Sequence, residues 1–213
     1  HHAQPSSVSI TQACESGTVY SLEEIQAIAA VAHSHGLSMH MDGARFANAL
    51  VTLDVTPAQM TWQAGIDVLS FGGTKNGCLA AEAVVFFRPE LVGDFPFLQK
   101  RAGQLLSKSR FISSQFAGYL KDGTWLRNAR QANAMAQRLS KGLAALPGIE
   151  LAYPTQSNEV FVSMPAALIE RLSAQGLSVN DEELDGKAVR FVAAWNTPAS
   201  QVDDLLKVLA DHC

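Results

Sequence analysis

Up to Pro89, short apolar runs alternate with amphipathic stretches along the chain. Four of the runs predict strands, at residues 8–11, 37–41, 66–71 and 83–87. Helix-type spacing of apolar residues between them predicts helices that begin at the capping residues Ser21 and Thr56. A succession of strand, helix, strand, helix and strand is typical of a parallel sheet wrapped by helices. We therefore predict an α/β domain that binds ligands beyond the carboxyl ends of its strands.

The pattern changes after Pro89, where helical spacing dominates. Residues 98–120 are compatible with one long helix, and a turn at 122–123 leads to a second helix over 124–146. The remaining apolar runs predict a smaller α/β unit, with strands near 149–152, 159–163 and 189–193 and helices over 166–175 and after 198. We expect three parts: a large-domain portion at 1–97, a connecting helical pair at 98–147 and a small C-terminal domain at 148–213.

Composition and charge narrow the class of partner. The chain has 213 residues, a net charge of −4 and scattered basic residues, which argues against a nucleic-acid partner. No apolar run approaches the ~20 residues of a membrane helix. The cysteines Cys14, Cys78 and Cys213 show neither a pairing pattern nor metal-ligand spacing. We therefore expect a cytoplasmic protein with no metal site and no membrane partner.

Two charged residues stand directly after predicted strands. Asp42 begins an Asp-Gly-Ala-Arg sequence that ends at Arg45, and Lys75 lies in the glycine-rich loop 72–77 together with the hydroxyl of Thr74. A lysine can hold an aldehyde cofactor as an imine when its amine is neutral, and we expect the end of the buried strand to desolvate Lys75. A buried acid such as Asp42 would keep the ring nitrogen of such a cofactor protonated.

Other interpretations of these residues stay open. Lys75 alone could be a solvated surface charge. Arg45 has a planar guanidinium that suits a carboxylate, but it could form a structural ion pair with Asp42. Arg190 lies on an apolar strand, where a charge needs a partner or a cleft. It could bind a substrate carboxylate, or it could occupy the edge of a sheet.

Together these motifs resemble the low-specificity threonine aldolases, fold type I enzymes that use pyridoxal phosphate (PLP). The resemblance rests on residues 39–49, on the loop 72–77 that contains Lys75, on Arg190 and on residues 11–21. The last of these segments is similar to one in bacterial members of the family, which include phenylserine aldolases. It extends over almost the whole chain. It implies a PLP-transferase-like large domain with a parallel sheet, a small C-terminal α/β domain, and a homodimer or homotetramer with active sites completed across a dimer interface.

The resemblance also implies a role for each candidate residue. Lys75 would bind PLP covalently as the internal aldimine, Asp42 would pair with the pyridine nitrogen, and Thr74 would lie in the cofactor site. Arg45, also in that site, and Arg190 would hold the carboxylate of the amino acid. The implied reaction is retro-aldol cleavage of a β-hydroxy-α-amino acid, such as threonine, allo-threonine or phenylserine, to glycine and an aldehyde.

One departure from the family concerns the phosphate of PLP. In the family, further segments precede the region that resembles this chain, and they carry the glycine-rich phosphate-binding loop and the aromatic ring that stacks on PLP. We therefore expect this chain to be the C-terminal portion of a longer enzyme, with the full-length protein active. Without the phosphate anchor at a helix N-terminus, the chain as given would bind PLP weakly or not at all.

Three functions remain as hypotheses. The first is the PLP-dependent aldolase. The second is a β-eliminating lyase or an aminotransferase, since related β-eliminating lyases carry a variant of the acid–arginine motif. The third is a non-catalytic fragment that associates with itself through the helical pair. The products separate the first two, because an aldolase releases glycine and an aldehyde whereas β-elimination releases ammonia and a keto acid.

Overall fold

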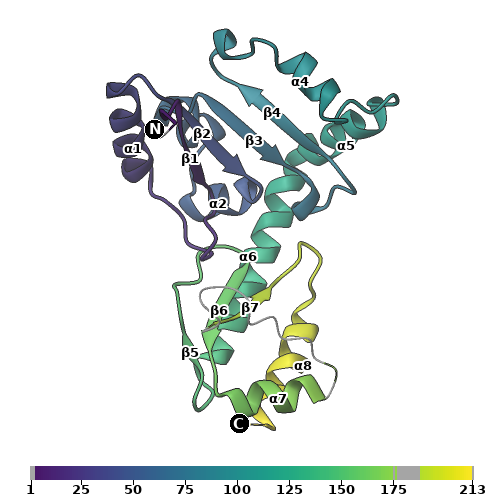
Figure 1. The fold of residues 1–213 in the computed structure, drawn as a ribbon. Coiled ribbons are helices and arrows are strands. Elements are labelled where there is room, and N and C mark those ends of the chain that lie inside the picture. The colour runs from purple at the N-terminus through teal and green to yellow at the C-terminus, as the bar shows by residue number, and fades with distance from the viewer. Residues whose placement is uncertain (1–2, 175, 177–187, 213) are drawn as a thin grey trace. The chain divides into compact units, whose positions relative to one another are not determined.

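A computed structural model describes residues 3–174, 176 and 188–212. The chain forms two compact units. Figure 1 shows the ribbon coloured by residue number from the N-terminus to the C-terminus. The first unit comprises His1–Ala13 and Tyr20–Leu126, and the second comprises Cys14–Val19 and Arg127–Cys213. Each unit has its own sheet, so the α/β class predicted from the apolar pattern is confirmed.

The first unit is built on a four-stranded sheet in the order β1-β2-β3-β4 (Figure 1). Its strands are β1 (Ser7–Thr11), β2 (Ser38–Gly43), β3 (Val68–Gly72) and β4 (Glu82–Phe86). The first three strands run parallel, as predicted, whereas β4 runs antiparallel to β3. The reversal has a simple cause. A parallel neighbour needs a crossover of about a dozen residues or more, and the connection 73–81 is too short to provide one.

Helices cover the face of this sheet that carries Met39, Met41 and Leu69, which are all buried. The predicted caps are confirmed: Ser21 caps α1 (Leu22–Ser34), and Thr56 caps α3 (Pro57–Met60), which a short 3-10 turn η1 (Trp62–Ala64) extends. The apolar pattern did not predict α2 (Phe46–Leu53). Its first five residues are all buried, so it lacks the one-sided pattern of a surface helix.

The predicted long helix over 98–120 is wrong. The structure has two separate helices, α4 (Phe95–Arg101) and α5 (Arg110–Leu120), after a 3-10 turn η3 (Pro89–Leu91). Between the two helices Gly103 has a φ of 71°, in the left-handed region that ends a helix. Gly118 lies inside α5. The turn predicted at 122–123 is present as η4 (Lys121–Gly123), which leads directly into α6 (Thr124–Leu143).

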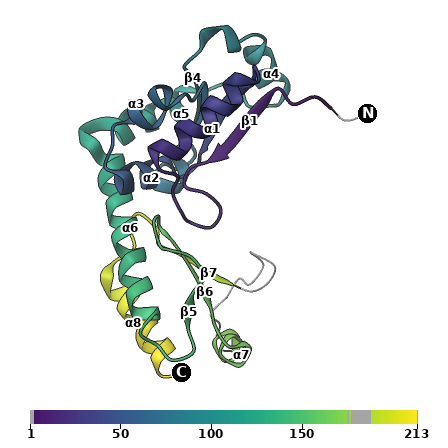
Figure 2. The ribbon, with the colours of Figure 1, turned by 90° about the vertical axis from the view of Figure 1, so that its left-hand side faces the viewer.

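The second unit contains most of α6 and a three-stranded antiparallel sheet in the order β5-β6-β7. Its other elements are β5 (Glu150–Leu151), β6 (Glu159–Ser163), α7 (Ala166–Ala174), β7 (Val189–Val192) and α8 (Ala199–Ala210). Helices α6 and α8 lie side by side (Figure 2), because Gly142 leaves room for Leu206. The apolar residues of α6, α7, α8, β6 and β7 form one core.

Asp67 connects several elements of the first unit. Its carboxylate is buried and accepts a hydrogen bond of 2.7 Å from the Met39 N–H. It also lies 3.0 Å from the His33 ring and 3.6 Å from the Arg88 guanidinium. Burial alone would raise the pKa of Asp67, but the Met39 N–H, the His33 ring and Arg88 together hold that pKa below its usual value. The ionised form of Asp67 therefore stabilises the fold.

Replacing Asp67 with asparagine should lower the free energy of unfolding at pH 7 by about 1.5–3 kcal/mol, because the bonds to a charged acceptor are lost. A lowered carboxyl pKa stabilises the fold above the unfolded value of ~3.9, and that stabilisation is lost as the pH falls through the folded value. The difference between wild type and Asp67→Asn should therefore shrink below about pH 4. Urea unfolding of both proteins from pH 3 to pH 8 measures it. A difference that does not vary with pH would contradict a charged Asp67.

Candidate functional site

The carboxylate of Asp42 lies at the carboxyl end of β2, on the face opposite to Met41. Asp42 is half-buried, and its Oδ1 accepts a hydrogen bond of 2.9 Å from the Ala44 N–H. Its neighbours in register are Thr11 on β1 and Ser70 on β3. The turn at Ala44 therefore fixes the direction of the carboxylate at the end of the sheet, where an α/β sheet binds its ligands.

His40 lies two residues before Asp42 on the same face of the sheet. Its Nδ1 is 2.7 Å from Ser9 Oγ on β1, and its Nε2 is 3.0 Å from Ser70 Oγ on β3. The imidazole thus links three adjacent strands through side-chain hydrogen bonds.

The ends of β2 and β3 approach each other closely. A Cβ atom placed on Gly72 would lie 2.9 Å from both Cα and O of Ala44, and one placed on Gly43 would lie 2.7 Å from Ser70 O. Neither position has room for a side chain, because the nearest atoms belong to the backbone. Because Gly43 and Gly72 have no side chains, the backbone of the Asp42 turn can pack against the end of β3, where the loop of residues 73–81 begins.

That loop, residues 73–81, carries Lys75 and is called the lysine loop below. Lys75 lies in a short 3-10 turn, η2 (Thr74–Asn76), directly after β3, and its side chain is exposed. The expectation that the end of the strand desolvates Lys75 is therefore wrong for the described part of the chain. The loop that carries Lys75 begins where Gly72 packs against the Asp42 turn, and the Lys75 side chain is open to solvent.

Hydrogen bonds within the lysine loop and to its surroundings fix its course. The Gly73 carbonyl accepts bonds of 3.1 Å from the N–H groups of both Asn76 and Cys78. The hydroxyl of Thr74 accepts a bond of 3.1 Å from the Ala81 N–H, and Gln115 on α5 accepts bonds from two further N–H groups of the loop. Thr74 itself is exposed and belongs to the same loop as Lys75.

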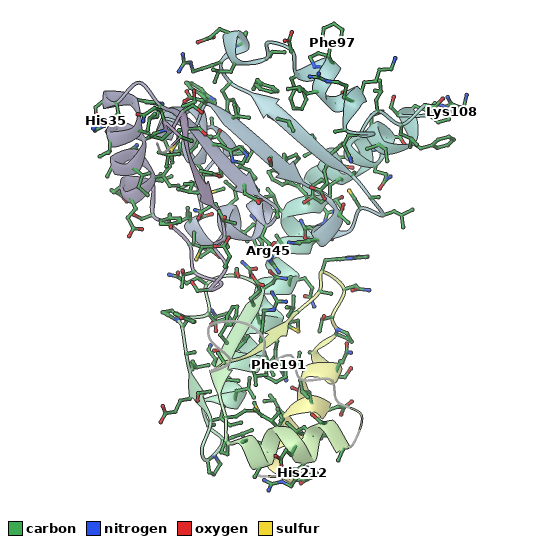
Figure 3. The ribbon with its side chains drawn as sticks, viewed as in Figure 1. His35, Arg45, Phe97, Lys108, Phe191 and His212 are labelled. Atoms are coloured by element: carbon green, nitrogen blue, oxygen red, sulfur yellow. The ribbon has the colours of Figure 1, made fainter. Side chains whose placement is uncertain are left out.

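The two candidate arginines lie in different units. Arg45 is the residue at which α2 begins, just beyond the end of β2 (Figure 3), and it is half-buried. Arg190 lies on β7 in the second unit, where its Nη1 is 3.5 Å from Oε1 of the buried Glu159. The structure thus places Asp42, Arg45 and Lys75 in the first unit, just after the adjacent strands β2 and β3, and Arg190 in the second.

Sequence reasoning missed the residues that support this group. Asn76 follows Lys75 but is buried, and its side chain bonds to Tyr119 and to the Trp125 carbonyl. Burial raises the pKa of Tyr119 to about 12, so its phenol stays protonated at neutral pH. The pairing of Glu159 could have been predicted from the sequence. An acid beside the apolar run of residues 160–162 is expected to be buried, and a buried acid needs a cation such as Arg190.

The described residues also limit the kind of site. They contain no cluster of three or more His, Cys, Asp or Glu side chains that could hold a metal ion. Within the same ranges, no helix is both long enough and apolar enough to span a membrane.

The chain is similar to proteins of known family. Residues 1–166 match the model of a family described as beta-eliminating lyase. Over 96% of its length the chain is 47% identical to a low specificity L-threonine aldolase of a Pseudomonas species, and over 97% it is 44% identical to that of Pseudomonas aeruginosa. It spans only 59% and 60% of these relatives. A solved structure of Leishmania major threonine aldolase matches 97% of the chain with a TM-score of 0.87 and 29% identity, with 61% of that protein covered.

These matches confirm the resemblance to threonine aldolases that was inferred from the sequence. The family model alone covers well over half of the chain. The chain therefore belongs to the beta-eliminating lyase family.

Proposed function

We propose that the protein is a PLP-dependent aldolase that cleaves β-hydroxy-α-amino acids to glycine and an aldehyde. The observation that carries the proposal is the placement of Asp42 and Lys75 at the ends of adjacent parallel strands, with Gly72 packed against Ala44. The names of the relatives support the same activity. Threonine, allo-threonine and phenylserine are the substrates we propose.

The residues present fit PLP at two of its functional groups. Lys75 offers an exposed primary amine to the aldehyde, and Asp42 offers an oriented carboxylate to the pyridine nitrogen. When bound, PLP supplies a sink for the electron pair released as the Cα–Cβ bond breaks. Thr74 adds a hydroxyl in the same short turn as Lys75. We assign no described residue to the cofactor's phosphate group.

The side chains of this chain would then divide the work as follows. The Asp42 carboxylate holds a positive charge on the ring nitrogen, and the Ala44 N–H keeps that carboxylate in place. Lys75 holds the cofactor covalently. Arg45 and Arg190 bind the carboxylate of the amino acid, for which a planar guanidinium is well suited. Arg190 also forms an ion pair with Glu159, whose Oε1 lies 3.5 Å from the Arg190 Nη1.

We also propose that the protein associates with itself as a homodimer or homotetramer in the cytoplasm. Large apolar side chains are exposed on and around α4 and α5, among them Phe97, Leu105, Leu106 and Phe111, and Phe97 and Lys108 are labelled in Figure 3. Exposed apolar groups of this size favour association. The cysteines Cys14 and Cys78 are free thiols, which suits a reducing compartment. A sedimentation velocity mass equal to one chain would contradict the association.

The proposed function is tested by trapping and by product analysis on the complete gene product. The protein is incubated with PLP, reduced with borohydride and digested, and mass spectrometry of the peptides should find the label on Lys75. L-Threonine, L-allo-threonine and phenylserine should each be tested for release of glycine and an aldehyde. The 213-residue chain, handled in the same way, shows how much of the cofactor site it holds by itself.

Each outcome decides between the hypotheses. Glycine and aldehyde together with a label on Lys75 support the aldolase. Ammonia and a keto acid would instead support β-elimination on the same site. A complete gene product that gives neither label nor products would contradict both, and would favour a protein that only associates with itself.

A further inference from the structure

The residue that follows Lys75 in the chain points in the opposite direction. Asn76 is only 3% exposed, whereas the neighbouring Lys75 is exposed. The Asn76 Nδ2 group donates hydrogen bonds of 2.7 Å to Tyr119 Oη on α5 and of 2.8 Å to the Trp125 carbonyl on α6. Both hydrogens of the amide are therefore used, and Asn76 links the lysine loop to two helices.

The acceptors of these two bonds belong to a packed aromatic cluster. The rings of Phe71, Tyr119 and Trp125 lie between 5.9 and 6.2 Å from one another by their centroids. Tyr119 is 4% exposed and Trp125 is 9% exposed. Phe71 belongs to β3, the strand that leads into the lysine loop, so the cluster holds the strand and both acceptors as one packed group.

An amide is the group that these acceptors require. The Trp125 carbonyl can only accept, so its partner must donate, and a buried carbonyl without a donor is costly. A carboxylate of the same shape has no hydrogen to give and would repel that carbonyl oxygen. Replacement of Asn76 by aspartate therefore changes the chemistry of the anchor while it preserves the volume of the side chain.

We propose that Asn76 is a positioning residue for Lys75. It fixes the short turn at Thr74–Asn76 to α5 and α6, so that the backbone of Lys75 is held rigid at the end of β3 while its amine stays free to move and react. The role of the lysine in this inference rests on the proposed function. The anchoring of the loop does not, because it is a property of the protein without any ligand.

The test compares Asn76→Asp and Tyr119→Phe with a matched control in the second unit. The control is Asn158→Asp, because Asn158 is a buried asparagine whose Nδ2 donates a bond of 2.8 Å to the Ala193 carbonyl of the second unit. The first measurement is hydrogen exchange of the Asn76 and Cys78 amides in the protein without cofactor. The second is kcat and KM of the complete gene product, and the third is the melting temperature.

Asn76→Asp should speed exchange of the two loop amides about ten-fold or more, since faster exchange reports easier local opening. It should lower kcat by roughly 10²-fold with KM changed far less, as expected when a reacting group is misplaced by about 1 Å. Tyr119→Phe removes one of the two acceptors and should give a smaller effect of the same kind. Asn158→Asp should lower the melting temperature but leave exchange of the loop amides unchanged.

Two results would overturn the proposal. One is wild-type exchange of the loop amides in both Asn76→Asp and Tyr119→Phe. The other is equal loop exchange in Asn158→Asp, which would reduce the effect to a general loss of stability. If Asn76→Asp does not fold, Tyr119→Phe still gives the answer. If the wild type has no aldolase activity, the proposed function fails, while the exchange data still decide whether Asn76 anchors the loop.

Discussion

Replacing Lys75 with alanine should abolish turnover of β-hydroxy amino acids, with a fall in kcat of at least about 10³-fold. The reason is chemical, because Lys75 carries the primary amine of the loop that follows β3. Since the side chain of Lys75 is exposed, its removal should leave the free energy of unfolding within about 0.5 kcal/mol of wild type. Lys75→Arg separates charge from reactivity, because arginine keeps the positive charge but stays protonated and forms no covalent bond to an aldehyde.

Borohydride trapping, steady-state kinetics and thermal unfolding measure these effects. The control is Lys141→Ala, which removes another exposed lysine from α6 in the second unit and should leave trapping and kcat unchanged. If Lys75→Ala turns over threonine at the rate of the wild type, Lys75 is not the reacting amine and the site must be assigned elsewhere.

Replacing Asp42 with asparagine is the second change with a large expected effect. Asparagine keeps a side-chain oxygen that can accept the Ala44 N–H bond, so the turn and the fold should be preserved. It loses the negative charge that would hold a proton on the ring nitrogen of PLP. Because a preorganised electrostatic contact of this kind contributes strongly to a reaction, kcat should fall by roughly 10²-fold.

The kinetics of Asp42→Asn should be compared with those of a matched exposed aspartate. Asp54 ends α2 with a φ of 53°, a conformation that asparagine also adopts, so Asp54→Asn should retain both stability and activity. The visible spectrum of bound PLP gives an independent readout, because it reports the protonation of the ring. An Asp42→Asn protein with the spectrum and kcat of the wild type would exclude a role for Asp42 at the ring nitrogen.

Local sequence patterns predicted the positions of Asp42 and Lys75, because these positions depend only on where each strand ends and in which direction it runs. Asp42 and Lys75 each follow an apolar run, and adjacent parallel strands end at one edge of a sheet, so their proximity could be inferred without coordinates. The caps at Ser21 and Thr56 were equally local, because each involves residues within one helical turn. These predictions succeeded because few residues determine them.

Some of the features that were missed depend on contacts between distant residues, and others on a single turn or connection. Asn76 bonds to partners 43 and 49 positions away, and no local pattern specifies such bonds. The periodic apolar residues of 98–120 suggested one helix, but the left-handed backbone at Gly103 separates α4 from α5. The direction of β4 depended on the length of its connection rather than on its own residues. Exposure of Lys75 depends on which segments surround it, and strand composition does not contain that information.

The close approach of the strand ends has a consequence for attempts to redesign this protein. A Cβ atom added at position 43 or 72 would lie 2.7 or 2.9 Å from backbone atoms, so any side chain there would move one loop away from the other. The distance between the loop that carries Asp42 and the loop that carries Lys75 is therefore set by the packing of the main chain. In a library of variants randomised at positions 43 and 72, we expect almost all active members to have glycine at both. Neighbouring positions with more space are better choices for randomisation.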